Sequence, residues 1–255
     1  MSAWANVRIS LNHESAAREL EKFRGDLTEA KEIRGERRSK QAAAEATVTR
    51  YREPLVSAAW ELQARIYNIH TGRFFGKDRS SYHVDHTLYV FAQYLGWREI
   101  IRQEIQFMDL GGTQATKILA ERLEEVTDAM SDSDVSLPMN FKLFRGEQRA
   151  IGEKMMAPAD STTQVPLGHR CLGYACFVAE LNGPDFNVWF SKLRNSMEYL
   201  ESTETPDFGR LSWLQNALID LIDLLDPDCV RFPQHLRNRM TMPHEVAVLR
   251  AKLGT

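Results

Sequence analysis

The first fifth of the chain shows the clearest pattern of apolar and polar positions. Between Glu14 and Glu53 there is no proline, there are two glycines, and nineteen residues carry charges of nearly balanced sign. Apolar residues recur at spacings of three and four, which places them on one face of a helix. The pattern predicts one long, exposed helix with a narrow apolar seam.

In a heptad register, this seam has two apolar blocks in phase with each other. The first block runs from Leu20 to Ala30 and the second from Val48 to Ile69, while Arg34, Arg37 and Gln41 occupy the seam positions between them. A seam of this length predicts assembly with a second copy of the chain or with a protein partner. The expected interface residues are Leu20, Phe23, Leu27, Val48, Tyr51 and Leu55.

Two features suggest where this helix begins and ends. Val7 to Leu11 alternates apolar and polar residues, so we expect an extended arm before the helix, with Asn12 as its cap. Pro54 interrupts the seam, and we expect a kink or break near residues 52–55. The chain is therefore divided into an arm and long charged helix, 1–52, and a body, 53–255.

The body shows helical periodicity and no run with the period of a strand. The fold class predicted is all-α, a multi-helix bundle with a long coiled-coil-like arm at its N-terminus. Residues 157–166 contain two prolines and predict a loop. Helices are expected at 56–70, 82–110, 113–130, 138–156, 167–181, 184–201 and 210–225, with a short last helix from Pro243.

Composition narrows the class of protein. A content of 43% hydrophobic and 26% charged residues is typical of soluble globular proteins. The formal net charge of -3 does not favour a protein that binds nucleic acid over its whole surface. Three cysteines without zinc-type spacing favour a reduced compartment. The sequence predicts no transmembrane segment or signal peptide, and we expect a cytoplasmic protein.

The strongest candidate for chemistry is the pair His83 and His86, which lie one helical turn apart. Together with a carboxylate such as Asp109, Asp220 or Asp223, they could bind a metal ion in a metal-dependent hydrolase. Their spacing and the order of Asp85 and His86 differ from the known histidine motifs of such enzymes. The simpler interpretation is a hydrogen-bonded pair at the start of a buried helix, with no metal or cofactor.

A basic cluster from Lys31 to Lys40 offers a further alternative, an adaptor that binds nucleic acid or an anionic membrane surface. Glu29, Glu32 and Glu36 lie among these basic residues and weaken the local positive field. Ion pairs along one helix explain the pattern equally well.

Four runs resemble segments of a loosely defined group of uncharacterised bacterial all-helical proteins. The resemblance covers about residues 51–156 and implies only the helical fold, because no function is known for that group. The sequence as a whole favours a non-enzymatic helical interaction or scaffold protein that assembles through its N-terminal helix. The four runs are Tyr51–Leu55, Leu62–Tyr67, Leu95–Leu110 and Phe144–Arg149.

Overall fold

The computed structural model describes residues 3–72, 81–105, 114–134, 136–158 and 169–253. These residues form a mostly helical protein, which confirms the helical fold class, with one small two-stranded sheet. The helices are α1 (Ala3–His70), α2 (Ser81–Ile105), α3 (Gln114–Ser131), α4 (Arg145–Lys154), α5 (Tyr174–Glu180), α6 (Pro184–Ser202), α7 (Gly209–Leu225), the 3-10 helix η2 (Gln234–Leu236) and α8 (His244–Leu253). The strands are β1 (Met156–Pro158) and β2 (His169–Cys171).

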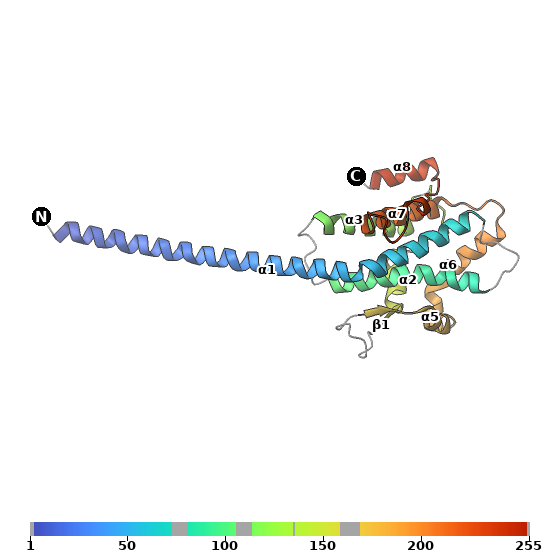
Figure 1. Ribbon diagram of the computed structural model, residues 1–255, viewed down its shortest axis with the longest axis horizontal. Coiled ribbons are helices and arrows are strands. Elements are labelled where there is room, and N and C mark those ends of the chain that lie inside the picture. The colour runs from blue at the N-terminus through green and yellow to red at the C-terminus, as the bar shows by residue number, and fades with distance from the viewer. Residues whose placement is uncertain (1–2, 73–80, 106–113, 135, 159–168, 254–255) are drawn as a thin grey trace.

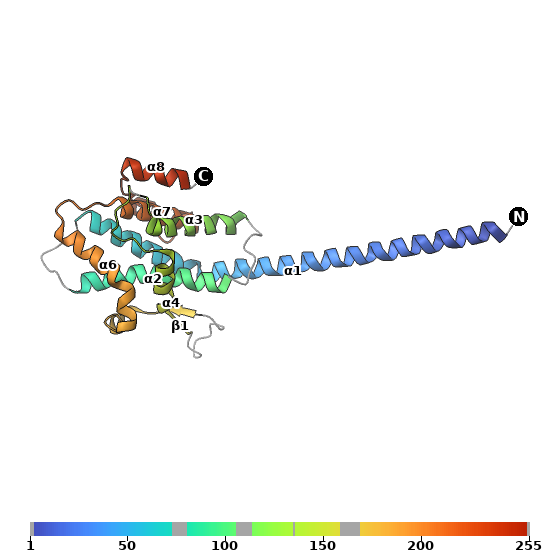
Figure 2. The same ribbon diagram turned by 180° about the vertical axis from the view of Figure 1, so that it is seen from behind.

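Helix α1 has two parts with different surroundings. Its C-terminal part packs against α2 and α7, whereas its N-terminal part stands clear of the other elements in both views (Figures 1 and 2). Tyr51 is the first residue of α1 described as buried. The core of the body therefore begins at about Tyr51.

Helix α7 lies at the centre of the body. Nearly all of its residues are buried, including Trp213 and the polar side chains of Gln215 and Asn216. The two amides bind backbone of the C-terminal segment: Gln215 donates to the Asn238 carbonyl at 2.7 Å and Asn216 to the Met240 carbonyl at 2.9 Å. A helix buried on all sides needs such partners, because an unpaired buried amide destabilises the fold.

Of the kink or break expected near residues 52–55, the break does not occur, and the extended arm expected before the helix is wrong. Helix α1 continues from Ala3 through Pro54 to His70. A proline removes one N–H and displaces the carbonyl four residues earlier, which belongs here to the exposed Arg50 and can be hydrated. Val7 to Leu11 is helical because a strand of that length needs another strand to pair with.

The chain between α4 and α5 also differs from expectation. Where a helix was predicted over 167–181, the described residues from His169 form strand β2 and the short helix α5, and β2 pairs antiparallel with β1 through Met156 and Cys171. This hairpin contacts α2 at Gly96, where an added Cβ would lie 2.8 Å from the Cys171 Sγ. Glycine thus permits a close approach that helical periodicity does not reveal.

The predicted helix 138–156 is shorter in the structure. Phe141 is buried with a φ of 59°, a left-handed conformation that excludes it from a helix, and its N–H donates to Ser196 Oγ at 2.8 Å. Helix α4 therefore begins only at Arg145. Helices α6, α7 and α8 confirm three of the predicted helices, and their ends lie within about two residues of the predicted ends.

Candidate functional site

The exposed face of α1 carries the apolar residues predicted for an interface. Leu20 is 55% exposed, Phe23 68% and Leu27 43%, and the neighbouring Ile33 is 44% exposed. Every residue from 20 to 39 is exposed except Ala30, which is half-buried. We call Leu20, Phe23, Leu27 and Ile33 the arm face. No described element of the chain covers it.

Two other predicted interface residues lie in the body core. Tyr51 and Leu55 are 5% and 1% exposed, and the Tyr51 ring centroid lies 6.2 Å from that of Trp97 on α2. Burial and the nearby Glu104 carboxylate raise the pKa of Tyr51. At these positions, α2 and α7 of the same chain pack against α1, where the sequence predicted a partner. The side chain of Val48 is outside the described residues.

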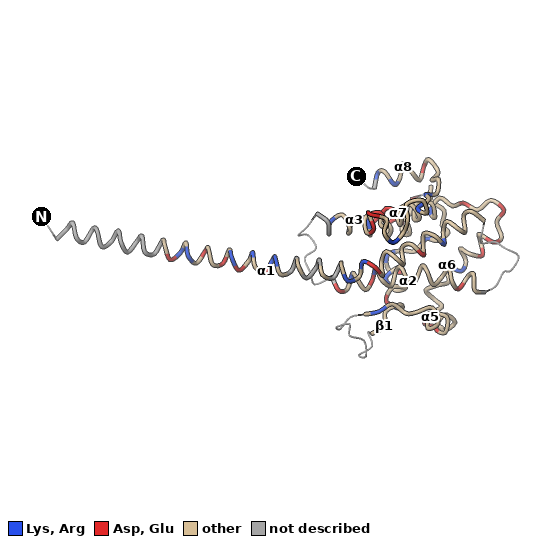
Figure 3. Tube along the Cα trace, in the orientation of Figure 1, with Lys and Arg blue, Asp and Glu red and all other residues tan. Residues whose placement is uncertain are grey.

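Charges of both signs alternate along the described part of α1 (Figure 3). The described basic residues between Lys31 and Arg38 are exposed, as are Glu32 and Glu36 among them. Interleaved carboxylates reduce the positive potential that a phosphate backbone or an anionic membrane would need. The adaptor hypothesis has no further observation in its favour.

His83 and His86 lie at the start of α2, in an aromatic and cationic environment. The His86 ring stacks on Tyr82 with centroids 5.4 Å apart, and Arg65 donates from Nη2 to the His83 carbonyl at 2.6 Å. Burial, followed by the charges of Arg65 and His83, lowers the pKa of His86. The positive charge of Arg65, which acts on the His86 imidazole, also opposes the binding of a metal cation there.

The carboxylates proposed as further metal ligands have other partners. Asp220 and Asp223 lie 2.7 and 2.9 Å from Nη2 of Arg239, and Asp220 also pairs with Arg250. Asp109 is outside the described residues. No group of three or more metal-ligating side chains occurs within the described ranges. The geometry therefore adds no support to the hydrolase interpretation.

The periodicity of α7 alone would place Asp220, Asp223 and Asp226 on a face exposed to water. In the structure they have partners within the protein instead. Asp226 is buried and accepts hydrogen bonds from the backbone of residues 230–232, while Arg237 pairs with both Asp223 and Asp226 at 2.7 Å. Burial opposes ionisation of Asp226, but the backbone donors and Arg237 outweigh it and lower its pKa. This network attaches the C-terminal segment to α7.

No pattern in the sequence indicated the cavity between the 139–144 segment and α6. Its lining includes Lys142 and Phe144, together with Lys192 of α6, which lies about fifty residues later in the chain. Periodicity cannot reveal such a site, because it reports only which residues share one face of one helix. Its chemistry is considered below.

Comparison of the chain with protein-family models, curated proteins and solved structures finds no match. The resemblance to bacterial helical proteins stays a prediction. Among the described helices, none has the length and apolar character needed to span a membrane.

Proposed function

We propose that this protein is a non-enzymatic helical interaction protein that assembles with a second copy of itself through the arm face. The observation that carries the proposal is the exposure of Leu20, Phe23 and Leu27 on a helix that stands clear of the body. Large apolar side chains clustered in water are typical of an interaction surface. In proteins most of the stability of a helix comes from packing of its apolar face, and no described element of the chain packs on the arm face.

The heptad positions of the charged residues beside the apolar seam indicate how two copies of α1 would pair. With Leu20 and Leu27 at position a, Asp26 occupies position g and Lys31 the following position e. Both residues are exposed. In a parallel, in-register pair of helices, position g of one copy lies opposite the next position e of the other copy. Asp26 of each copy then faces Lys31 of the other.

The remaining flanking positions are compatible with the same arrangement. In the sequence register, the same g-to-e spacing relates Glu19 to Arg24 and Lys40 to Glu45, and no pair of like charges has this spacing between residues 19 and 52. An antiparallel pair would instead place e opposite e. Since Arg24, Lys31 and Arg38 all occupy position e, many of its alignments bring like charges together.

Arg34 and Arg37 occupy the seam between the apolar blocks, and both are exposed in the single chain. Their long side chains can turn outward to water while their stems remain at the helix interface. Polar residues at seam positions reduce stability but oppose shifted alignments, in which they would face apolar residues. The polar centre therefore favours specificity over affinity.

Sedimentation equilibrium tests the assembly. We expect the full chain to form a dimer at tens of micromolar, and a chain that begins at Thr47 to be monomeric, because only the former contains the arm face. A full chain that remains monomeric at these concentrations would rule out self-assembly.

Charge reversal tests the parallel arrangement. Asp26→Lys or Lys31→Glu alone should weaken the dimer about fivefold, because each creates two like-charge pairs. The double variant should restore the affinity. Glu29→Lys, at an outer heptad position, is the matched control and should have little effect. If the double variant stays as weak as the single variants, the helices are not parallel and in register.

A further inference from the structure

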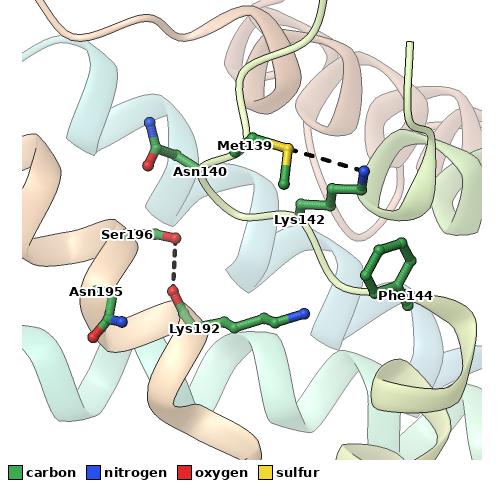
Figure 4. Close-up of a pocket in the computed structure, with 7 residues that line it drawn as sticks. All are labelled: Met139, Asn140, Lys142, Phe144, Lys192, Asn195 and Ser196. Carbon is green, nitrogen blue, oxygen red and sulfur yellow. Dashed lines mark hydrogen bonds between the residues drawn. The ribbon is translucent and has the colours of Figure 1, made fainter. Parts of the chain in front are cut away.

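The cavity between the 139–144 segment and α6 has a volume of about 230 Å³ (Figure 4). It combines two lysines and two asparagines with an apolar wall. Met139 is exposed and Phe144 is about half exposed, so this wall is accessible from solvent. The residues that line the cavity are Met139, Asn140, Lys142, Phe144, Lys192, Asn195 and Ser196.

Lys142 is the most unusual residue of this cavity. It is only 7% exposed, and its Nζ donates to Ser133 Oγ at 2.8 Å, with the Met139 Sδ 4.0 Å away. No carboxylate of the described residues forms an ion pair with it. Charged side chains are rarely buried unless an opposite charge compensates the lost hydration. Lys142 therefore lacks a counter-ion of its own.

Lys192 brings a second positive charge to the same place. The Nζ atoms of Lys142 and Lys192 lie 4.9 and 4.7 Å from the centroid of the Phe144 ring. Glu147 pairs with Lys192 at 2.6 Å and also accepts a hydrogen bond from the Phe144 N–H. One carboxylate thus accompanies two ammonium groups, which leaves a net positive charge beside the cavity.

The cavity is built on a fixed framework. Ser196 accepts from the Phe141 N–H and donates to the Lys192 carbonyl at 2.7 Å, which ties the 139–144 segment to α6. The amides of Asn140 and Asn195 make no hydrogen bond within the described part of the chain, so they are available to a ligand. A site prepared in this way loses little conformational entropy on binding.

We propose that this cavity binds a small molecule that carries an oxyanion, a phosphate or carboxylate group, attached to a flat apolar portion. The oxyanion supplies the missing counter-charge of Lys142 and interacts with Lys192. The apolar portion packs against the Phe144 ring and Met139. This assignment is independent of assembly through α1.

Titration calorimetry with phenyl phosphate and with benzoate tests the assignment, with inorganic phosphate as the probe that lacks an apolar portion. We expect at least one aromatic anion to bind in the millimolar range or tighter, and inorganic phosphate to bind more weakly. Lys142→Met preserves the length of the side chain without its charge and should weaken binding at least tenfold. Lys117→Met, which removes an exposed lysine of α3, is the matched control and should leave affinity unchanged.

The relative affinities of phenyl phosphate and benzoate distinguish the two anion classes. Absence of binding by either aromatic anion, or equal affinity of the wild type and the Lys142→Met variant, would overturn the proposal. If Lys142→Met does not melt cooperatively, Lys192→Met replaces it, since Lys192 is about half exposed and its substitution spares the core. Unchanged affinity in that variant would likewise refute the site.

Discussion

Replacing Leu20 and Leu27 with glutamate is the most direct perturbation of the arm face. Both side chains point into solvent in the single chain, at 55% and 43% exposure. The double variant should therefore disrupt the dimer while it leaves the folded body intact. Substitutions of exposed residues usually change the free energy of unfolding by less than about 0.5 kcal/mol.

The size of the effect on assembly follows from these exposures. Full burial of a leucine side chain stabilises by about 1.5–3 kcal/mol, so a leucine that is half exposed gains about 1 kcal/mol when a partner covers it. Two leucines in each of two copies contribute about 4 kcal/mol, which corresponds to about a thousandfold in the dissociation constant. Repulsion between the four new carboxylates adds to this loss.

Sedimentation velocity over a range of concentrations measures the dissociation constant, and circular dichroism follows the melting of the body. A matched control carries Thr28→Glu and Ser39→Glu, which add the same charge at exposed outer positions of α1. We expect the control to dimerise like the wild type. If both variants weaken the dimer equally, total charge explains the effect and not the arm face. A double variant that dimerises normally would refute the reasoning altogether.

Three further predictions concern the body. A chain that begins at Thr47 should remain soluble, helical and cooperative in thermal melting, because the core begins at Tyr51; aggregation would show that the arm is part of the core. Arg237→Gln should lower the free energy of unfolding by about 3 kcal/mol, since it leaves the buried Asp226 carboxylate without its cationic partner. In the same denaturant titrations, Arg231→Gln, which alters an exposed pair, should change it by less than about 0.5 kcal/mol. His86 has a lowered pKa when folded, so its neutral form stabilises the protein above about pH 6.5, and this contribution is lost as the pH falls through the folded pKa. Melting curves of His86→Gln should accordingly show a smaller loss of stability between neutral and acidic pH than the wild type does.

Local patterns predicted the helices well because the interactions that form a helix are local. The long N-terminal helix, the wide apolar face of α7 and the termination of α7 near Asp226 all follow from residues three or four positions apart. The same reasoning placed Leu20, Phe23 and Leu27 on an exposed face.

Tertiary structure decided what covers each apolar face. Tyr51 and Leu55 share a heptad register with Leu20, yet α2 and α7 bury them in the body. Buried residues of α1 lie on both sides of Pro54, where the sequence predicted a kink or break. Periodicity identifies an apolar face but contains no information on whether the chain itself or a partner occupies it.

The cavity and the ion-pair network depended even more on distant residues. Lys142 and Lys192 are fifty positions apart in the chain, yet both lie beside the Phe144 ring. Asp226 pairs with Arg237 only because the C-terminal segment folds back onto α7. Ser196 holds Phe141 in a left-handed conformation that local propensity disfavours. The sequence by itself determined most of the helices of this protein, because their hydrogen bonds are made between near neighbours. Only the tertiary structure determined its charged sites, because the free energy of a charge depends on burial and on partners that lie far away in the chain.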